Sequence, residues 1–326
     1  MSGDVTAQRV LVVGSANVDF TVAAPRLPAV GETVSGGTLL VNHGGKGANQ
    51  AVAARRLGAE VRFVGCVGDD GSGREIRAAL EAERIGVDGV AVTREAATGT
   101  ALIVVDSEGR NQIAVAPGAN WRLALEHVRS RADDFVWAQV VLCQLETPLE
   151  TVAWALEEAR RRGAVTVLNP APVREGLADL WRFVDYLTPN EGEAERLTGI
   201  AVRDLRSAAA AGHALRRRGV GTVIVTLGAA GALACTGEGD GEGVMRAPAR
   251  AVTVVDTTAA GDAFNGALAT ALGGTSRLED ALRFANAAAA LACTRRGAQP
   301  SLPTRAEVDG LLRASERGDL PRGAGE

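Results

Sequence analysis

Hydrophobic residues along the chain fall into short runs that alternate with amphipathic stretches. The runs are rich in Val, Ile and Leu and end at a glycine or a polar residue, a pattern that predicts buried strands. The stretches between them carry apolar residues at helical spacing. Strands are predicted at 9–13, 61–67, 140–143, 165–168, 184–187 and 222–226, and helices at 47–57, 74–83, 149–162, 204–218, 261–272 and 278–294.

This alternation predicts the fold class. Strands that alternate with helices form right-handed crossovers, so we expect an α/β protein with a doubly wound, mostly parallel sheet flanked by helices. Three further segments, 33–41, 100–105 and 111–115, look like short strands split by turns and are expected to form a small β-sheet lid. We expect residues 1–326 to form a single domain, with the lid contributed by about 18–43 and 98–116.

Composition and charge restrict the class of partner. The 326 residues are 46% hydrophobic and 23% charged, which is typical of a globular protein. A net charge of −4 provides no overall positive field for nucleic acid. No apolar stretch reaches the roughly 18 residues of a membrane span, and the first residues lack the apolar core of a signal peptide. We therefore expect a cytoplasmic protein that binds neither nucleic acid nor membranes.

Several sequence features argue against other sites. The four cysteines, Cys66, Cys143, Cys235 and Cys293, lie far apart in or beside apolar runs, so we expect buried, reduced thiols. The three histidines show no metal-ligand spacing. The chain has neither a P-loop nor a G-x-G-x-x-G sequence after its first strand. The glycine-rich segments 68–73 and 237–243 are interpreted as a helix-entry loop and an exposed hairpin turn.

The basic residues include a single lysine. Of the 35 basic side chains, 34 are Arg, and the exception is Lys46 within Gly44–Asn49. An ammonium group is compact whereas a guanidinium group is a broad planar fork, so a crowded polar site can require lysine. Lys46 is therefore a candidate binding residue. The alternative is that this lysine is present by chance.

Residues 254–266 predict a binding site for an anion. A β-branched run leads through Ala259, Ala260 and Gly261 into a predicted helix, whose first N–H groups and dipole favour negative charge. A phosphoryl group in transfer needs such stabilisation, and the attacking hydroxyl needs a base. Asp262 is the candidate base. Alone, a carboxylate at this position could simply stabilise the helix.

Polar residues recur where other predicted strands end. Carboxylates and carboxamides suit sugar hydroxyl groups, which both donate and accept hydrogen bonds. Each such residue alone could be a cap or a turn residue. They are Asn17 and Asp19 after the first strand, Glu146 after 140–143, and Asn190 and Glu193 after 184–187.

Seven segments, in this order, resemble the motifs of the ribokinase-like carbohydrate kinase family. They cover about residues 9–312. The resemblance implies ATP-dependent phosphorylation of D-ribose at its 5-hydroxyl, with Mg²⁺, activation by K⁺ and a homodimer formed through the lid. The segments are GSANVD from Gly14, GGKGANQA from Gly44, NPAP from Asn169, TPNEGEAE from Thr188, VTLG from Val225, DTTAAGD from Asp256 and TRRGAQPS from Thr294.

The resemblance also implies residue roles. Asp262 would take the proton of the sugar hydroxyl while the backbone of Ala259, Ala260 and Gly261 holds the phosphoryl group, and Gly44–Gly45 would be the hinge of the lid. The implied sugar-binding residues are Asn17, Asp19, Gly45, Lys46, Asn49, Glu146 and Asp262. The implied nucleotide-binding residues are Asn190 and Glu193, at the phosphates and the hydrated Mg²⁺, with Thr226, Gly228, Gly231, Gly261 and Asn286. The implied K⁺ loop contains Asp256, Thr258, Ala292, Arg295, Gly297 and Ser301.

The sequence departs from the family pattern at a few positions, which leaves alternatives open. Ala263, Asn286 and Ala229–Ala230 replace residues that are common in the family, and they bear on the nucleotide contacts more than on the sugar contacts. The second hypothesis is a kinase of deoxyribose, another furanose or a nucleoside. A third is a non-catalytic sugar sensor on the same scaffold.

Overall fold

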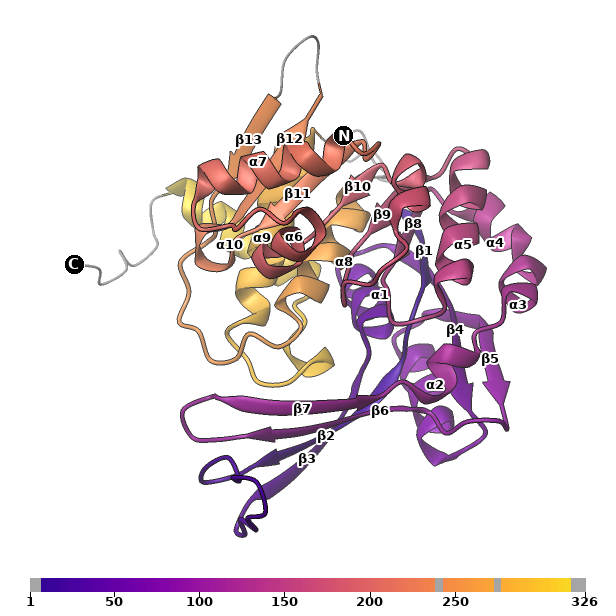
Figure 1. Cartoon of the computed structure of the whole chain (residues 1–326), viewed down its shortest axis with the longest axis vertical. Coiled ribbons are helices and arrows are strands. Elements are labelled where there is room, and N and C mark those ends of the chain that lie inside the picture. The colour runs from indigo at the N-terminus through magenta and orange to yellow at the C-terminus, as the bar shows by residue number, and fades with distance from the viewer. Residues whose placement is uncertain (1–6, 238–242, 273–276, 318–326) are drawn as a thin grey trace.

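A computed structural model describes residues 7–237, 243–272 and 277–317 of the chain. Its main body is a nine-stranded sheet covered by helices on both faces (Figure 1). The strand order is β13-β12-β11-β10-β9-β8-β1-β4-β5. The strands are β1 (Arg9–Val13), β4 (Glu60–Gly68), β5 (Gly86–Thr93), β8 (Val140–Cys143), β9 (Val165–Leu168), β10 (Tyr186–Leu187), β11 (Thr222–Thr226), β12 (Ala232–Thr236) and β13 (Gly243–Ala247).

The predicted fold class is confirmed. Seven strands of this sheet pair in parallel, in the order β5, β4, β1, β8, β9, β10 and β11. β12 and β13 add an antiparallel hairpin at one edge. The sequence reading did not assign β5, β12 or β13. The hairpin turn interpreted at 237–243 lies mostly outside the described residues, although its flanking strands pair as a hairpin requires.

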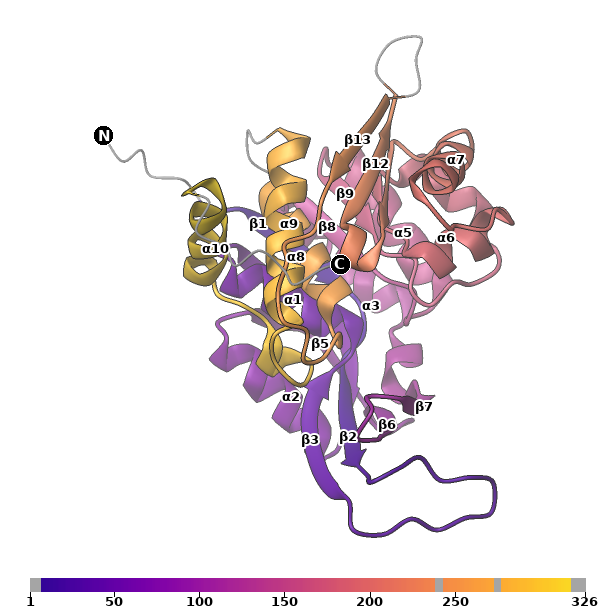
Figure 2. The same cartoon turned by 90° about the vertical axis from the view of Figure 1, so that its left-hand side faces the viewer.

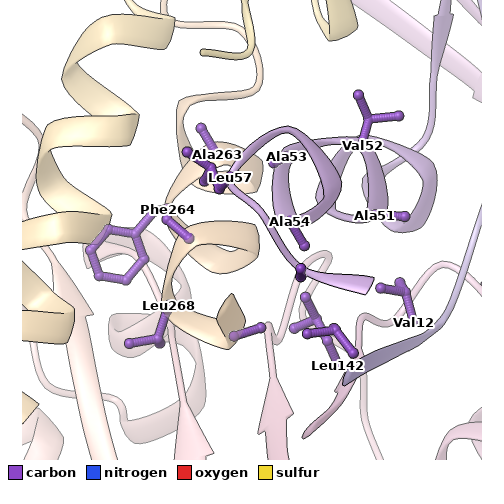
Figure 3. Packing of buried hydrophobic residues seen from close by; sticks show 14 of the residues in the cluster. Val12, Ala51, Val52, Ala53, Ala54, Leu57, Leu142, Ala263, Phe264 and Leu268 are labelled. Carbon is purple, nitrogen blue, oxygen red and sulfur yellow. The ribbon is translucent and has the colours of Figure 1, made fainter. Parts of the chain in front are cut away.

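Two layers of apolar side chains hold the helices on the sheet. Successive residues of a strand point to opposite faces, so Val10 and Val12 of β1 join one cluster while Leu11 and Val13 join the other. Figure 3 shows the first cluster, in which Val12 and Leu142 lie beneath two packed helices. The helices that carry Ala53 and Gly266 pack closely. A Cβ on Gly266 would lie only 2.6 Å from the Cβ of Ala53, so this approach requires glycine.

The helices divide between these two faces. The first cluster includes residues of α1 (Lys46–Arg56), α2 (Gly71–Ala82), α8 (Ala260–Leu272), α9 (Leu278–Ala292) and α10 (Arg305–Arg317). The second includes residues of α3 (Leu125–Ser130), α4 (Ala132–Trp137), α5 (Leu149–Arg161), α6 (Glu191–Thr198) and α7 (Leu205–Arg216). Short 3₁₀ turns lie at η1 (Gly118–Arg122), η2 (Ala178–Phe183), η3 (Gly228–Ala230) and η4 (Gln299–Ser301).

A separate four-stranded sheet projects from the main body (Figures 1 and 2). Its order is β3-β2-β6-β7, formed by β2 (Asn17–Ala23), β3 (Thr38–Gly44), β6 (Gly99–Val105) and β7 (Asn111–Ala116). The strand predicted at 33–41 begins only at Thr38, since Gly36 has a φ of 88° that an extended strand does not accept. Asn17 and Asp19 follow β1, as predicted, and they belong to β2.

The thiol prediction holds at three of four positions. All four cysteines are free, and Cys66, Cys143 and Cys235 are buried. Cys293 is only partly buried, because it lies just beyond the end of α9. The segment 68–73 is partly helical: α2 begins at Gly71, and the Asp70 side chain caps it by accepting the Gly73 N–H at 2.8 Å. No helix among the described residues is long and apolar enough to cross a membrane.

Candidate active site

Five neighbouring strands end at the same edge of the main sheet and present polar residues there. The chain builds β4 and β5 on one side of β1 and the strands from β8 onward on the other side. The carboxyl ends of β1 and β8 therefore meet where the strand order reverses, the place where ligands bind in such folds. The residues at these ends are Ser15 after β1, Gln144 and Glu146 after β8, Asn169 after β9, Thr188 and Asn190 after β10, and Thr226 in β11.

A polar cavity opens beyond these strand ends. Its volume is about 230 Å³, and α8 and the turn before it form one wall. Seven predicted site residues line it: Lys46, Asn190, Glu193, Thr226, Ala259, Gly261 and Asp262. It is also lined by Asn169, Ala171, Thr188, Thr257 and Asn265, which we did not predict as site residues.

Asp262 lies in the first turn of α8 and is 8% exposed. Asn49 donates through Nδ2 to its Oδ2, and Gln50 donates through Nε2 to its Oδ1, both at 2.9 Å. Burial raises the pKa of Asp262, whereas Lys46 and these two amide donors favour the ionised form. The result is a carboxylate whose proton affinity exceeds that of an exposed aspartate.

The turn before α8 is suited to hold an anion. Ala259 has a φ of 60°, a conformation that non-glycine residues rarely adopt. Among the described groups, no acceptor pairs with the N–H of Gly261 or of Asp262, and a Cβ on Gly261 would meet no atom within 4 Å. The Ala260 N–H, in contrast, donates to the Thr257 carbonyl at 3.2 Å. The open part of the predicted anion site is therefore at Gly261 and Asp262.

A side-chain network fixes this turn. Asn265 donates through Nδ2 to the carbonyl of Gly261 at 2.8 Å. Its Oδ1 accepts the Thr188 hydroxyl at 2.6 Å. Both residues are buried, so the network ties the start of α8 to the end of β10.

Two carboxylates and the only lysine form the neighbouring part of the site. Glu146 accepts the Lys46 backbone N–H at 3.1 Å and the Ser15 hydroxyl. Burial opposes the charge on Lys46, but Asp262, Glu146 and Glu193 together raise its pKa. Burial, with repulsion from Glu146 and Asp262, raises the pKa of Asp19 to about 6.

The junction between β3 and α1 brings the remaining sugar-site candidates together. Gly45 has a φ of 86°, and a Cβ there would lie 2.8 Å from the backbone of Ala16 and Asn17. Asn17 is oriented by Asn120, whose Nδ2 donates to its Oδ1 at 2.7 Å. A Cβ on Gly44 would lie 2.0 Å from Oδ2 of Asp19. Glycine at both positions thus lets the small sheet meet α1 closely.

The nucleotide-site candidates divide between two places. Asn190 caps α6, and Asn190 and Glu193 form a reciprocal capping box at 2.8 and 2.9 Å. Asn190 also bridges to Thr226, after which Gly228 and Gly231 adopt positive φ. Asn286 does not line the cavity, because its Nδ2 donates to the carbonyls of Ala247 at 2.8 Å and Pro248 at 3.4 Å.

The residues predicted to surround K⁺ bring two loops together. Asp256 accepts the Thr258 N–H and hydroxyl, and it accepts the Gly297 N–H at 2.9 Å. Burial opposes the ionised form, but these donors lower the pKa of Asp256. The Ala292 carbonyl accepts the Arg295 N–H at 3.3 Å, and Ser301 donates to Ala298. Among the described residues, no group of three or more His, Cys, Asp or Glu side chains is placed to hold a metal ion.

Comparison with known proteins identifies relatives over nearly the whole chain. The profile of the pfkB family carbohydrate kinases matches residues 7–305. A ribokinase of Haemophilus influenzae is 41% identical over 91% of this chain and 96% of its own length. A ribokinase of Mus musculus is 40% identical over 93% of this chain and 94% of its own length. The structure of an Arabidopsis thaliana ribokinase complexed with ribose and ATP superposes with a TM-score of 0.84 at 34% identity, covering 94% and 99% of the two chains.

Proposed function

The chain belongs to the pfkB family of carbohydrate kinases and is a sugar kinase; we propose that it transfers the γ-phosphoryl group of ATP to the 5-hydroxyl of D-ribose. The observation that carries the proposal is the position of a buried carboxylate, Asp262, beside the N–H groups of Gly261 and Asp262. Neither N–H group has an acceptor among the described groups. Similarity to ribokinases, among them one complexed with ribose and ATP, supports ribose as the acceptor.

In this mechanism the Asp262 carboxylate accepts the proton of the sugar hydroxyl as it attacks phosphorus. The N–H groups of Gly261 and Asp262 stabilise the charge that develops on the phosphoryl oxygens. Lys46, Asp19, Asn17, Asn49 and Glu146 orient the sugar, and the lid closes about Gly44–Gly45 to exclude water. The Oδ1 of Asn49 supports this role, since it is buried without a described partner and can accept from a hydroxyl.

The oxygen-rich donor sets fit the two cations of the proposal. Asn190 and Glu193 would hold hydrated Mg²⁺ beside the phosphates, where the ion supplies charge neutralisation. A weakly charged hard ion prefers oxygen ligands, so one carboxylate, two hydroxyl groups and several backbone carbonyls suit K⁺. They belong to Asp256, Thr258, Ala292, Arg295, Gly297 and Ser301. We assign the nucleotide to Thr226, Gly228, Gly231 and Gly261. Asn286 would contribute through the backbone it holds rather than from the cavity wall.

The quaternary arrangement is also a proposal. On the small sheet, Val22, Leu39, Val41 and Leu102 share the face opposite to Asp19, and each is at least 36% exposed. A contiguous apolar face of this kind fits a second copy of the chain, which would form a homodimer through the lid, about 18–43 and 98–116. Since the second substrate is ATP, we propose the cytoplasm as the location.

A coupled assay of ADP formation tests the proposed function. We expect the highest kcat/KM with D-ribose among ribose, deoxyribose, other furanoses and nucleosides, because several polar groups face the sugar. The assay is run with K⁺ or Na⁺ as the only monovalent cation, and we expect more turnover with K⁺. A preference for a nucleoside or for deoxyribose would make that compound, and not ribose, the acceptor. The absence of ADP formation with every compound would favour a sugar sensor.

A further inference from the structure

We propose that Gln50, held in place by Gln144, is a positioning residue for the catalytic base Asp262. The proposal rests on the proposed function, since it assumes that Asp262 accepts the sugar proton. Gln50 and Gln144 are both fully buried, and neither has a role in the mechanism described above.

The contacts of Gln50 leave its side chain one orientation. Its Nε2 donates to Oδ1 of Asp262 at 2.9 Å and to Oδ1 of Asn169 at 3.1 Å, which uses both of its N–H groups. Its Oε1 accepts Nε2 of Gln144 at 2.6 Å. A rotated amide would place its oxygen against two acceptor oxygens, so the network fixes the donor toward Asp262.

Gln144 lies between the carboxyl ends of β8 and β1. It follows β8 directly, and its Oε1 is buried with no hydrogen-bond partner among the described groups. Leaving a buried acceptor unpaired is costly. A Cβ on Gly14 would lie 2.0 Å from this same oxygen, so glycine at the end of β1 leaves the room that Gln144 occupies. This arrangement is explained if the Gln144 donor is needed at Gln50.

Asn49 and Gln50, both on α1, each donate to a different oxygen of the Asp262 carboxylate. Asn49 holds Oδ2 and Gln50 holds Oδ1, so the plane of the carboxylate cannot turn when the sugar enters. Asn49 keeps a buried Oδ1 with no partner among the described groups, which we assign to the sugar, whereas Gln50 donates to Asn169 and accepts from Gln144. Gln50 therefore acts on the reaction through Asp262 and not through the substrate.

The test measures kcat for ribose against pH in Gln50→Met. The ionisable groups that surround Asp262 are Lys46 on α1, Glu146 after β8, Asp19 on β2 and Glu193 on α6, and this substitution changes none of them. Loss of a donor to the carboxylate disfavours the ionised base, so we expect the acidic limb of kcat to move up by about one pH unit. We expect kcat at neutral pH to fall roughly 10- to 100-fold, while the KM for ribose changes less than about threefold.

Two further variants separate positioning from stability. Gln144→Met should change kcat and its acidic limb in the same direction as Gln50→Met, but by a smaller amount. In the double variant, the fall in kcat should be smaller than the product of the two single-variant falls. Thr151→Val removes another fully buried hydrogen bond, from the Thr151 hydroxyl to the Leu123 carbonyl at 2.9 Å, and should lower Tm without moving the limb.

Each outcome bears on a distinct claim. All values are taken per folded active site, counted by ribose binding. An unchanged acidic limb and an unchanged kcat in Gln50→Met would overturn the positioning role, as would independent effects of Gln50 and Gln144. Failure of the unaltered protein to phosphorylate any sugar would instead overturn the proposed function.

Discussion

Lys46 is a single residue on which the proposed sugar site depends. Its ammonium group lies among Asp262, Glu146 and Glu193, and its backbone N–H is bound to Glu146. Lys46 is partly buried in the acidic surroundings that the sequence suggested, and in such a setting a compact ammonium and a broad guanidinium are not equivalent.

We therefore predict that Lys46→Arg lowers kcat/KM for ribose by roughly tenfold or more although the charge is kept. The matched control is Arg94→Lys on the surface, where the side chain is 90% exposed. Steady-state kinetics of both variants give the comparison. Equal kinetics for Lys46→Arg and the unaltered protein would remove the argument from the single lysine.

Asp19 gives a prediction about stability. Its pKa is about 6 in the folded protein and near 3.8 when exposed, so the folded state disfavours the ionised form. The ionised Asp19 carboxylate therefore destabilises the folded protein above pH 6, and this destabilisation disappears as the pH falls toward 3.8. We predict that Asp19→Asn stabilises the ligand-free protein by about 1–2 kcal/mol at pH 8, less at pH 5, and weakens ribose binding.

Urea unfolding at both pH values measures this effect, with the exposed Asp88→Asn as the control for net charge. A loss of stability in Asp19→Asn at pH 8 would contradict the assigned environment of Asp19. In the same range of pH, the KM for ribose should rise as the pH falls below about 6, because protonated Asp19 loses an acceptor.

The sequence predicted individual site residues unevenly. Asp262, Lys46 and Glu193 were found because each stands out by type or by position at a strand end. Asn169 and Thr188 follow strands too, but they were not chosen as site residues. Gln50, Gln144 and Asn265 act through contacts between segments about 77 to 212 residues apart, and no local pattern reveals such contacts.

At the scale of an element, α6 has a structural role and a proposed chemical role. The N-x-x-E segment forms a capping box, and the Glu193 side chain also faces the cavity. The capping box is therefore present in the structure, and the role of the same two residues at Mg²⁺ is our proposal. Burial raises the pKa of Glu193 above its usual value, against the hydrogen bond from Asn190.

We predict that Glu193→Gln keeps the stability of the protein within about 0.5 kcal/mol but raises the Mg²⁺ concentration needed for half-maximal turnover several-fold. Glutamine can replace glutamate in a capping box but carries no charge. Asp204→Ala breaks the corresponding capping box of α7 and should cost about 1 kcal/mol without changing the Mg²⁺ requirement. An unaltered requirement in Glu193→Gln would exclude the chemical task.

Element prediction succeeded for most of the longer helices, but α10, with 13 residues, and β5, with eight, were not predicted. β1, β8, β9 and β11 have the predicted bounds, whereas α3, α4 and α6 were missed because they span only 6, 6 and 8 residues. β2 was missed because its polar residues, Asn17 and Asp19, look like a loop in sequence. Pairing with β3 and β6 imposes the extended conformation on them.

At the scale of the whole molecule, the small sheet projects from the main body (Figures 1 and 2). Its apolar face, defined by Val22, Leu39, Val41 and Leu102, is open in the single chain. We predict that Leu102→Arg, which puts a charge on this face, raises the dissociation constant of the dimer at least about a hundredfold.

Sedimentation equilibrium measures this dissociation constant directly. Val136→Arg is the matched control, since Val136 is also 58% exposed but lies on α4 of the main body. A protein that sediments as a monomer without any substitution would contradict the homodimer. The same dissociation constant for Leu102→Arg and Val136→Arg would move the interface away from the lid.

The proposed mechanism requires a sugar hydroxyl to lie beside both the Asp262 carboxylate and the N–H groups of Gly261 and Asp262. The most direct measurement is the single-turnover rate of ribose phosphorylation by Asp262→Asn, together with ribose binding by calorimetry. We predict a rate reduced by roughly 10³-fold or more, with ribose affinity within about tenfold of the unaltered protein. A rate close to that of the unaltered protein would contradict the assignment of the base and, with it, the proposed mechanism.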